Sequence, residues 1–322
     1  MVEFYLKTIQ EYALNSVSRN IACTLVIFGF GFGFTSLYSQ KNGNPIRLFY
    51  LGGQSNMTGF GYNKDLPGDL EKPLENVYIF QGNPVPDNQV DGGLGIWEVI
   101  KPGHGIGFTS DGNENHRSDR FGVELTFARK MKELYPNEKI AIIKYARNGS
   151  SLDSLSARQW GSWEVDYSSN NAINQYDNFL ATVNNALKNS DIDNDGVDDT
   201  LIPTGIVWMQ GESDAYKESA AHEYHLNLKK LMNLIRAVFR TDDLPVVIGK
   251  ITDSGNNNLG KVWKYGELVQ HAQEKYVASD KHAKIVRSTQ NYEYSDPYHY
   301  NSDGYIDLGE KFAEAIHAFQ NK

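Results

Sequence analysis

A serine, a histidine and a carboxylate occupy positions in this sequence that could carry out nucleophilic chemistry. Ser55 lies just after an apolar run, residues 46–50, and two glycines. This order is typical of a strand that ends in a tight turn, which would present the serine hydroxyl at the carboxyl edge of a sheet. The hydroxyl needs a base, and His299, three residues after Asp296, is the candidate. The alternative role for Ser55 is a helix N-cap.

Two further runs supply hydrogen-bond donors. Gly149 follows an apolar run, residues 140–145, and a glycine there lets a backbone N–H approach a reacting oxygen closely. Gln210 follows residues 205–209, and its amide can donate a hydrogen bond without carrying charge. Hydrolysis through a serine ester needs such donors, because negative charge develops on the substrate oxygen.

These residues require a fold that brings several strand ends to one edge. Most of the apolar runs are continuous, as expected of parallel strands that are buried on both faces. The strands predicted are 46–50, 77–80, 140–145, 205–209, 246–249 and 284–286, and the helices predicted between and after them are 123–135, 176–188, 220–240, 263–278 and 306–319. This alternation predicts an α/β fold, a three-layer α/β/α sandwich with a mainly parallel sheet.

The order of four motifs resembles a known family. Gly-Gln-Ser-Asn-Met at 53–57, a glycine block at 146–151, Trp-x-Gln-Gly-Glu-x-Asp at 208–214 and Asp-x-x-His at 296–299 resemble the SGNH hydrolases. The closer resemblance is to sialate O-acetylesterase-like proteins and to the acetylxylan esterases of carbohydrate esterase family six. It spans residues 47–319 and implies a flavodoxin-like central sheet.

The resemblance also implies roles. Ser55 would be the nucleophile, His299 the general base and then acid, and Asp296 the carboxylate that holds the imidazole. The backbone N–H groups of Ser55 and Gly149 and the side-chain amide of Gln210 would form the oxyanion hole, although many relatives have asparagine in place of Gln210. Gln54, Asn56 and Glu212 would support the site, with a structural hydrogen-bonding role favoured for Glu212 over direct catalysis.

A separate acidic run follows part of a calcium-binding pattern. Asp191, Asp193, Asp195 and Asp199 occupy positions one, three, five and nine of an EF-hand-type loop, with glycine at position six. Ile202 stands where the pattern has a bidentate glutamate. The run predicts either a weak structural Ca²⁺ site or a hydrated acidic turn, and no cofactor is expected for catalysis.

Long polar loops, residues 59–74, 81–95 and 102–118, predict the walls of a binding cleft. Aromatic side chains in or near loops make an aromatic-lined cleft plausible, although each one alone also fits an ordinary core position: Tyr62, Trp97, Phe108, Trp160 and Trp163. Arg147 fits a solvated or ion-paired cation better than a substrate clamp.

Composition limits the partners and the location. The formal net charge of −9 argues against a nucleic-acid or anionic-membrane surface and favours a neutral or weakly charged small molecule or polymer. The family resemblance implies that this partner is an acetylated carbohydrate. Residues 21–34 form an apolar run that fits a signal peptide better than a membrane span, with residues 1–39 as signal peptide or uncleaved anchor. The protein would be exported. Its one cysteine, Cys23, lies in that segment, which excludes a cysteine nucleophile in the mature chain.

The sequence predicts an exported esterase with one catalytic domain, residues 40–322. The resemblance implies that this esterase removes acetyl groups from sugar hydroxyls through an acetyl-serine intermediate. The alternatives are a lipase or thioesterase with another acyl preference, and a carbohydrate-binding relative without activity. A partner protein is not evident, and the sequence gives no indication of oligomeric state.

Overall fold

The apolar runs form the strands of one twisted sheet, which the computed structural model describes within residues 45–319, except 88, 169–172, 257 and 259. The strand order is β11-β10-β9-β1-β8-β3-β4. Every neighbouring pair is parallel except β3 and β4. The strands are β1 (Pro45–Gly53), β3 (Val77–Gln81), β4 (Glu98–Val99), β8 (Ile140–Ala146), β9 (Thr200–Met209), β10 (Val246–Gly249) and β11 (Ala283–Val286).

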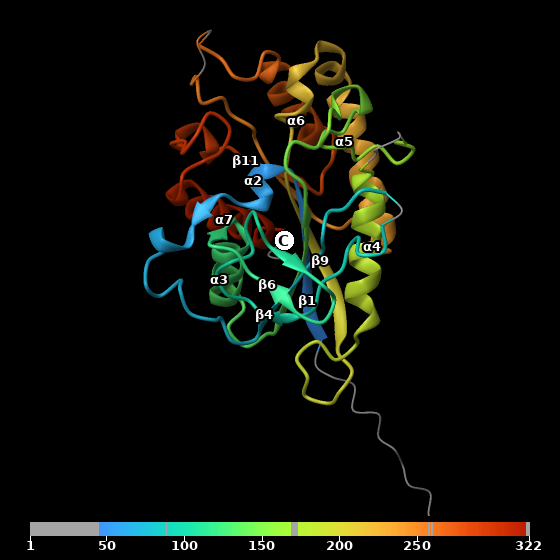
Figure 1. Cartoon of the computed structure of the whole chain (residues 1–322), viewed down its shortest axis with the longest axis vertical. Helices are drawn as coiled ribbons and strands as arrows, with labels where there is room; N and C mark the ends of the chain where they lie inside the picture. The colour runs from blue at the N-terminus through green and yellow to red at the C-terminus, as the bar shows by residue number, and fades with distance from the viewer. Residues whose placement is uncertain (1–44, 88, 169–172, 257, 259, 320–322) are drawn as a thin grey trace, which may run out of the picture. The chain divides into compact units, whose positions relative to one another are not determined.

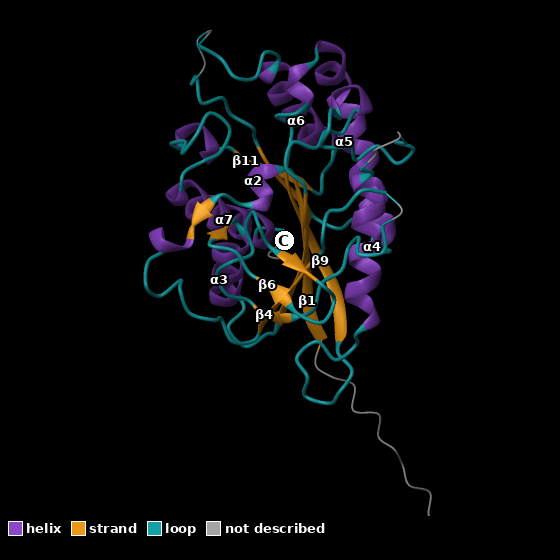
Figure 2. Cartoon of the chain, in the orientation of Figure 1, coloured by secondary structure: helices purple, strands orange, loops and turns teal. Residues whose placement is uncertain are grey.

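Helices cover both faces of this sheet. Helices α3 and α7 lie against one face, and α4, α5 and α6 lie against the other (Figures 1 and 2). Their bounds are α3 (Glu124–Leu134), α4 (Gln175–Lys188), α5 (Glu218–Val238), α6 (Gly266–Ser279) and α7 (Ser302–His317). The architecture confirms the predicted three-layer α/β/α fold with a mainly parallel sheet.

Strand β1 stands where the winding of the sheet reverses. The chain runs from β1 to β3 and β8 on one side, and then to β9, β10 and β11 on the other. Counted along the chain, the parallel strands lie in the order 2-3-1-4-5-6, whereas the flavodoxin order is 2-1-3-4-5. In both orders strand 1 is internal and its carboxyl end opens at the switch point, where α/β folds bind ligands.

Short elements surround that end of the sheet. They are α2 (Ser55–Thr58), β2 (Gly61–Tyr62) paired with β7 (Arg120–Phe121), β5 (Thr109–Ser110) paired with β6 (Asn115–His116), and the 3₁₀ turns η1 (Asn63–Asp65), η2 (Ser154–Ser156), η3 (Asp214–Tyr216) and η4 (Ser288–Asn291). Of these, β2, η1, β5 and β6 interrupt the long loops that the sequence predicted as walls of a cleft, and β7 lies just after the third of those loops.

Helix and strand ends differ from the predicted ones where hydrogen bonds decide them. Helix α7 begins at Ser302, earlier than the predicted 306, because the Asn301 side chain caps it by accepting from the Gly304 N–H. Strand β9 begins at Thr200 instead of 205, because it pairs with β1 from Pro45 onwards.

No helix within the described residues is long and apolar enough to cross a membrane. The apolar run at 21–34, Cys23 and the whole segment 1–39 lie outside the described residues. Export therefore stays a prediction.

Candidate active site

Ser55 lies at the carboxyl end of β1, as the first residue of α2. The turn before it depends on Gly53, whose φ is +149° and where a Cβ atom would lie 2.0 Å from the Met209 carbonyl oxygen. The N-cap of α2 is Gln54, and its side chain does not cap the helix. The alternative role of Ser55, an N-cap, therefore does not describe the structure.

Three strand ends are joined at this point by hydrogen bonds. The Gln54 N–H donates to the Met209 carbonyl (2.9 Å) at the end of β9, and the Arg147 N–H donates to the Gly53 carbonyl (3.2 Å) from the end of β8. The Gln54 side chain also accepts from the N–H groups of Gly211 and Ser213, each at 3.3 Å. The residue before Ser55 thus ties the turn to the loop after β9.

His299 and Asp296 lie in the loop between η4 and α7, and both carboxylate oxygens of Asp296 are used. Oδ2 lies 2.7 Å from His299 Nδ1, and Oδ1 accepts from the backbone N–H groups of Tyr298 (2.7 Å) and His299 (2.9 Å). One carboxylate therefore shapes the loop and orients the ring, which leaves Nε2 on the opposite side for another partner.

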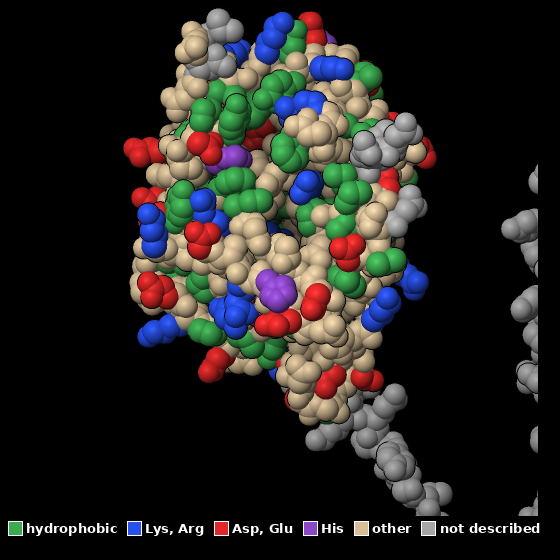
Figure 3. Space-filling view, viewed as in Figure 1, with side chains coloured by type: hydrophobic (Ala, Val, Ile, Leu, Met, Phe, Trp, Pro, Cys, Tyr) green, Lys and Arg blue, Asp and Glu red, His purple; other side chains and the backbone are tan. Residues whose placement is uncertain are grey.

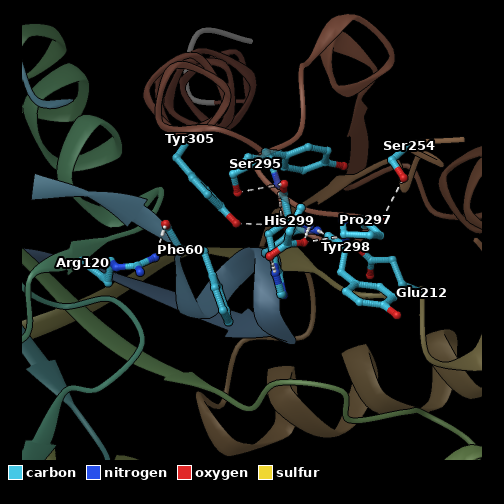
Figure 4. A network of polar contacts seen from close by, with 12 residues as sticks. Phe60, Arg120, Glu212, Ser254, Ser295, Pro297, Tyr298, His299 and Tyr305 are labelled. Carbon is cyan, nitrogen blue, oxygen red and sulfur yellow. Dashed lines mark hydrogen bonds and ion pairs between the residues drawn. The ribbon is translucent and has the colours of Figure 1, made fainter. Parts of the chain in front are cut away.

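The phenyl ring of Phe60 packs on one face of the His299 imidazole. The rings of Phe60 and His299 are stacked with centroids 3.6 Å apart and an interplanar angle of 6° (Figure 4). Arg120 holds Phe60 by donating to its carbonyl oxygen at 3.0 Å. Burial lowers the pKa of His299, the hydrogen bond and charge of Asp296 raise it, and the charge of Arg120 lowers it, so that the net shift is downward from 6.5. Sequence reasoning missed Phe60, since an aromatic residue in a loop carries no signal of what it stacks on.

Asn56 joins the turn of Ser55 to the loop of His299. Its Nδ2 donates to Glu212 Oε1 (2.8 Å) and to the Tyr298 carbonyl (3.3 Å). Its Oδ1 accepts from the Tyr305 hydroxyl (2.8 Å) and, weakly, from the Tyr300 N–H (3.4 Å). The amide is 1% exposed, so these contacts are shielded from water.

Glu212, in the loop after β9, accepts a hydrogen bond from Asn56. Its Oε2 is buried without a hydrogen-bond partner among the described residues, and burial raises the pKa of the carboxyl group (Figure 4). It contacts Asn56 and does not line the cavity that contains Ser55. The structural hydrogen-bonding role that the sequence favoured for Glu212 stays a prediction.

Gln210 is turned away from its predicted position. The side-chain amide nitrogen, Nε2, donates to Asp214 Oδ2 (2.6 Å) and to the Ser150 carbonyl (3.2 Å). The side chain is fully buried. Both amide hydrogens are therefore taken by the protein, so this arrangement does not offer Gln210 to a substrate oxygen. The motif identified Gln210 but could not predict its side-chain conformation, which is determined by the hydrogen bond to buried Asp214.

Asp214 and Gln210 together support the loop that contains Gly149. Asp214 accepts from the backbone N–H groups of Leu152 (3.0 Å) and Asp153 (3.0 Å), and burial raises its pKa to about 7. Gly149 has a φ of +67°, and a Cβ atom there would lie 2.6 Å from the Trp160 ring. The glycine is therefore required both by its backbone conformation and by the indole that packs on it.

Ser55, Gly149 and His299 line one cavity of about 340 Å³, a volume within the range of small-molecule sites. Arg158 also lines it, with its guanidinium 4.2 Å from the centroid of the Tyr216 ring. The remaining lining residues are Gln54, Phe60, Asn148, Trp160, Ser213, Tyr216, Trp263 and Tyr298. The cavity contains Trp160 of the aromatic residues that the sequence singled out, whereas Trp97 and Trp163 belong to the core.

The acidic run lies at the other end of the sheet, before β9. Asp191, Asp193 and Asp195 can each offer an oxygen within 4.8 Å of the others, whereas Asp199 accepts from the Ile192 N–H (2.9 Å) and is not part of this group. Lys139 forms ion pairs with Asp193 and Asp195. Three of the four predicted residues thus lie close enough to share an ion, and the Lys139 ammonium occupies two of them, so that the Ca²⁺ site stays a prediction.

Comparison with known proteins agrees with the fold. A family model described as carbohydrate esterase, sialic acid-specific acetylesterase, matches residues 45–318. No curated protein sequence is significantly similar.

Several solved structures share the fold at low sequence identity. An Arabidopsis thaliana protein has a TM-score of 0.60 at 19% identity, covering 85% of this chain and 99% of that one. A carbohydrate acetylesterase from Xanthomonas citri has a TM-score of 0.55 at 16% identity, covering 84% of this chain and 55% of that one. The protein NanS has a TM-score of 0.53 at 16% identity, covering 87% and 99%.

If the acidic run binds Ca²⁺, millimolar Ca²⁺ raises the Tm and excess chelator lowers it, because a ligand that binds only the folded state stabilises it. Asp191→Asn should remove the effect. The Tm is measured by calorimetry. A Tm that changes with neither Ca²⁺ nor chelator would identify the run as a hydrated turn held by Lys139.

Proposed function

Because the chain belongs to the carbohydrate esterase family of sialic acid-specific acetylesterases, and is therefore a serine carboxylic ester hydrolase, we propose that it removes acetyl groups from sugar hydroxyls with Ser55, His299 and Asp296 as its catalytic residues. One observation carries the proposal. Ser55 and His299 line the same cavity, and Asp296 Oδ2 lies 2.7 Å from His299 Nδ1, the ring nitrogen that is not assigned to Ser55.

The proposed reaction follows from this arrangement. His299 Nε2 takes the Ser55 proton while the serine oxygen attacks the acetyl carbonyl carbon. The tetrahedral intermediate collapses by expelling the sugar oxygen, which receives the proton from the imidazolium. Water, deprotonated by His299, then attacks the acetyl-serine, so that acetate leaves and the serine regains its proton.

Oxyanion stabilisation is proposed for the backbone N–H groups of Ser55 and Gly149. Both residues line the cavity, and both belong to turns that carry positive-φ glycines at Gly53 and Gly149. Gln210 then acts as a positioning residue, since its amide holds the Ser150 carbonyl directly after Gly149. A direct role of Gln210 would require its amide to leave Asp214.

The positive charge of Arg158 in the cavity favours a substrate sugar that carries a negative charge. Arg158 lines the cavity, and no carboxylate among the described residues forms an ion pair with it. Its guanidinium donates to Ser213 Oγ (3.4 Å) and has further N–H groups that suit the carboxylate of an acidic sugar, such as a sialic or uronic acid. We therefore expect acetylated acidic sugars to be hydrolysed faster than acetylated xylan.

Ser55→Ala should lower kcat for p-nitrophenyl acetate by at least about 10³-fold, because it removes the nucleophile. Ser279→Ala, which removes a hydroxyl at the end of α6, should keep the wild-type rate. Acetate release from acetylated sialic acid, pectin, xylan and simple sugars then ranks the substrates. An unchanged rate in a folded Ser55→Ala protein would contradict the proposed nucleophile.

The pH profile tests the base. Neutral imidazole accepts the proton, so kcat/KM should fall as the pH drops through the pKa of His299, which lies below 6.5. Arg120→Gln removes a charge that lowers this pKa, so the acid limb should move to higher pH. Arg129→Gln on α3 is the control. A limb that moves to lower pH in Arg120→Gln would contradict this assignment of the base.

A further inference from the structure

A second cavity, of about 400 Å³, lies next to the one that contains Ser55. Its walls come from the end of α2, the loop after β3, residues 105–110 and the end of β8. Asn148 lines both cavities, so the two are neighbours across that one side chain. None of the proposed catalytic residues lines the second cavity, and the reaction described above does not use it.

The walls of this cavity are held in place by the protein itself. Asn83, after β3, and Ser110, at the end of β5, exchange two hydrogen bonds, from Ser110 N–H to Asn83 Oδ1 (2.9 Å) and from Asn83 Nδ2 to the Ser110 carbonyl. The Gly82 N–H donates to the Lys144 carbonyl (3.1 Å) of β8. Because these contacts join loops that are distant in sequence, the cavity is formed before a ligand arrives.

Polar groups at the boundary between the cavities lack partners. Asn148 Oδ1 and Arg147 Nε are buried, and neither has a hydrogen-bond partner within the described part of the chain. Burying such groups without partners is unfavourable unless a ligand completes them. Arg147, predicted as a solvated or ion-paired cation, is half-buried, with its guanidinium 5.6 Å from the centroid of the Trp160 ring.

The chemistry of the walls suits a sugar better than an acyl chain. Asp91 and Asn148 offer oxygens to sugar hydroxyls, and Arg147 offers N–H groups to them. A pocket for a long acyl chain would instead be lined by apolar side chains throughout. Hydrophobic and charged side chains are interspersed on the face shown in Figure 3, which is the face of Figure 1 that bears these loops.

We propose that this second cavity is a saccharide subsite that binds the sugar next to the acetylated one, so that the preferred substrate is an oligosaccharide or glycan and not a free acetylated sugar. The proposal rests on the proposed function, because it takes the acetylated sugar to lie at Ser55. Binding energy from the neighbouring sugar would then lower KM or raise kcat for the same bond.

The test compares one acetylated sugar free and glycosidically linked. The pair is O-acetylated sialic acid and O-acetylated sialyllactose, or acetylated xylose and xylobiose if the substrate panel favours xylan. We expect kcat/KM for acetate release to be about tenfold higher for the linked sugar. Thr109→Trp, which places an indole at an exposed residue of the cavity wall, should abolish that ratio.

Matched variants separate blocking from misfolding. Thr109→Ala should keep the ratio. Thr200→Trp, the same tryptophan substitution at the exposed first residue of β9, at the opposite end of the sheet, should keep it too. Val85→Trp, on another wall, should act as Thr109→Trp does. All four variants should hydrolyse p-nitrophenyl acetate at near wild-type rates.

Two results would overturn the subsite. One is a wild-type ratio near one, with p-nitrophenyl acetate still hydrolysed. The other is a ratio unaffected by both tryptophans, while hydrolysis of p-nitrophenyl butyrate falls in both, which would assign the cavity to the acyl group. Absence of hydrolysis of every ester would instead contradict the proposed function, so the two failures are distinguishable.

Discussion

The hydrogen bonds of Asn56 are the constraint on which the candidate site depends. Ser55 and His299 lie 244 residues apart in the chain, on a strand turn and on a loop that no sheet hydrogen bond connects. Asn56 contacts the backbone on both sides of His299, and Glu212 holds the Asn56 amide from a third loop. Because the side chains of Asn56 and Glu212 are buried, water cannot readily replace the hydrogen bond between them. The Ser55 hydroxyl and the His299 imidazole are thereby kept in one relative position.

The sheet makes this arrangement possible by bringing strand ends together. The ends of β8, β1 and β9 are adjacent, and Gln54 and Arg147 bond across them, so motifs from three parts of the sequence meet at one edge. A carboxylate then supports each loop: Asp296 from within the loop of His299, and Asp214, from the loop after β9, for the loop that contains Gly149. Both accept backbone N–H groups, which gives irregular segments the hydrogen bonds that they would otherwise lack.

Much of this could be predicted from the sequence, because continuous apolar runs report strands buried on both faces, and the fold follows from their alternation with helices. The pairing of Asp296 with His299 was also predictable from their spacing. Side-chain direction was not. Gln210 points to Asp214, and Phe60 stacks on His299, because of contacts between segments that no local pattern records. The second cavity was unpredictable for the same reason, since its walls come from four separate segments.

The most direct test of the central claim is kcat for p-nitrophenyl acetate in Asn56→Ala, measured beside Asn174→Ala, which removes another buried amide at the N-cap of α4. If Asn56 fixes the position of His299 relative to Ser55, kcat falls by about 10²-fold or more in Asn56→Ala with little change in KM. The reason is that a small displacement of the reacting groups raises the barrier considerably. Asn174→Ala should lose stability and keep its kcat. A folded Asn56→Ala protein with the wild-type kcat would contradict the account.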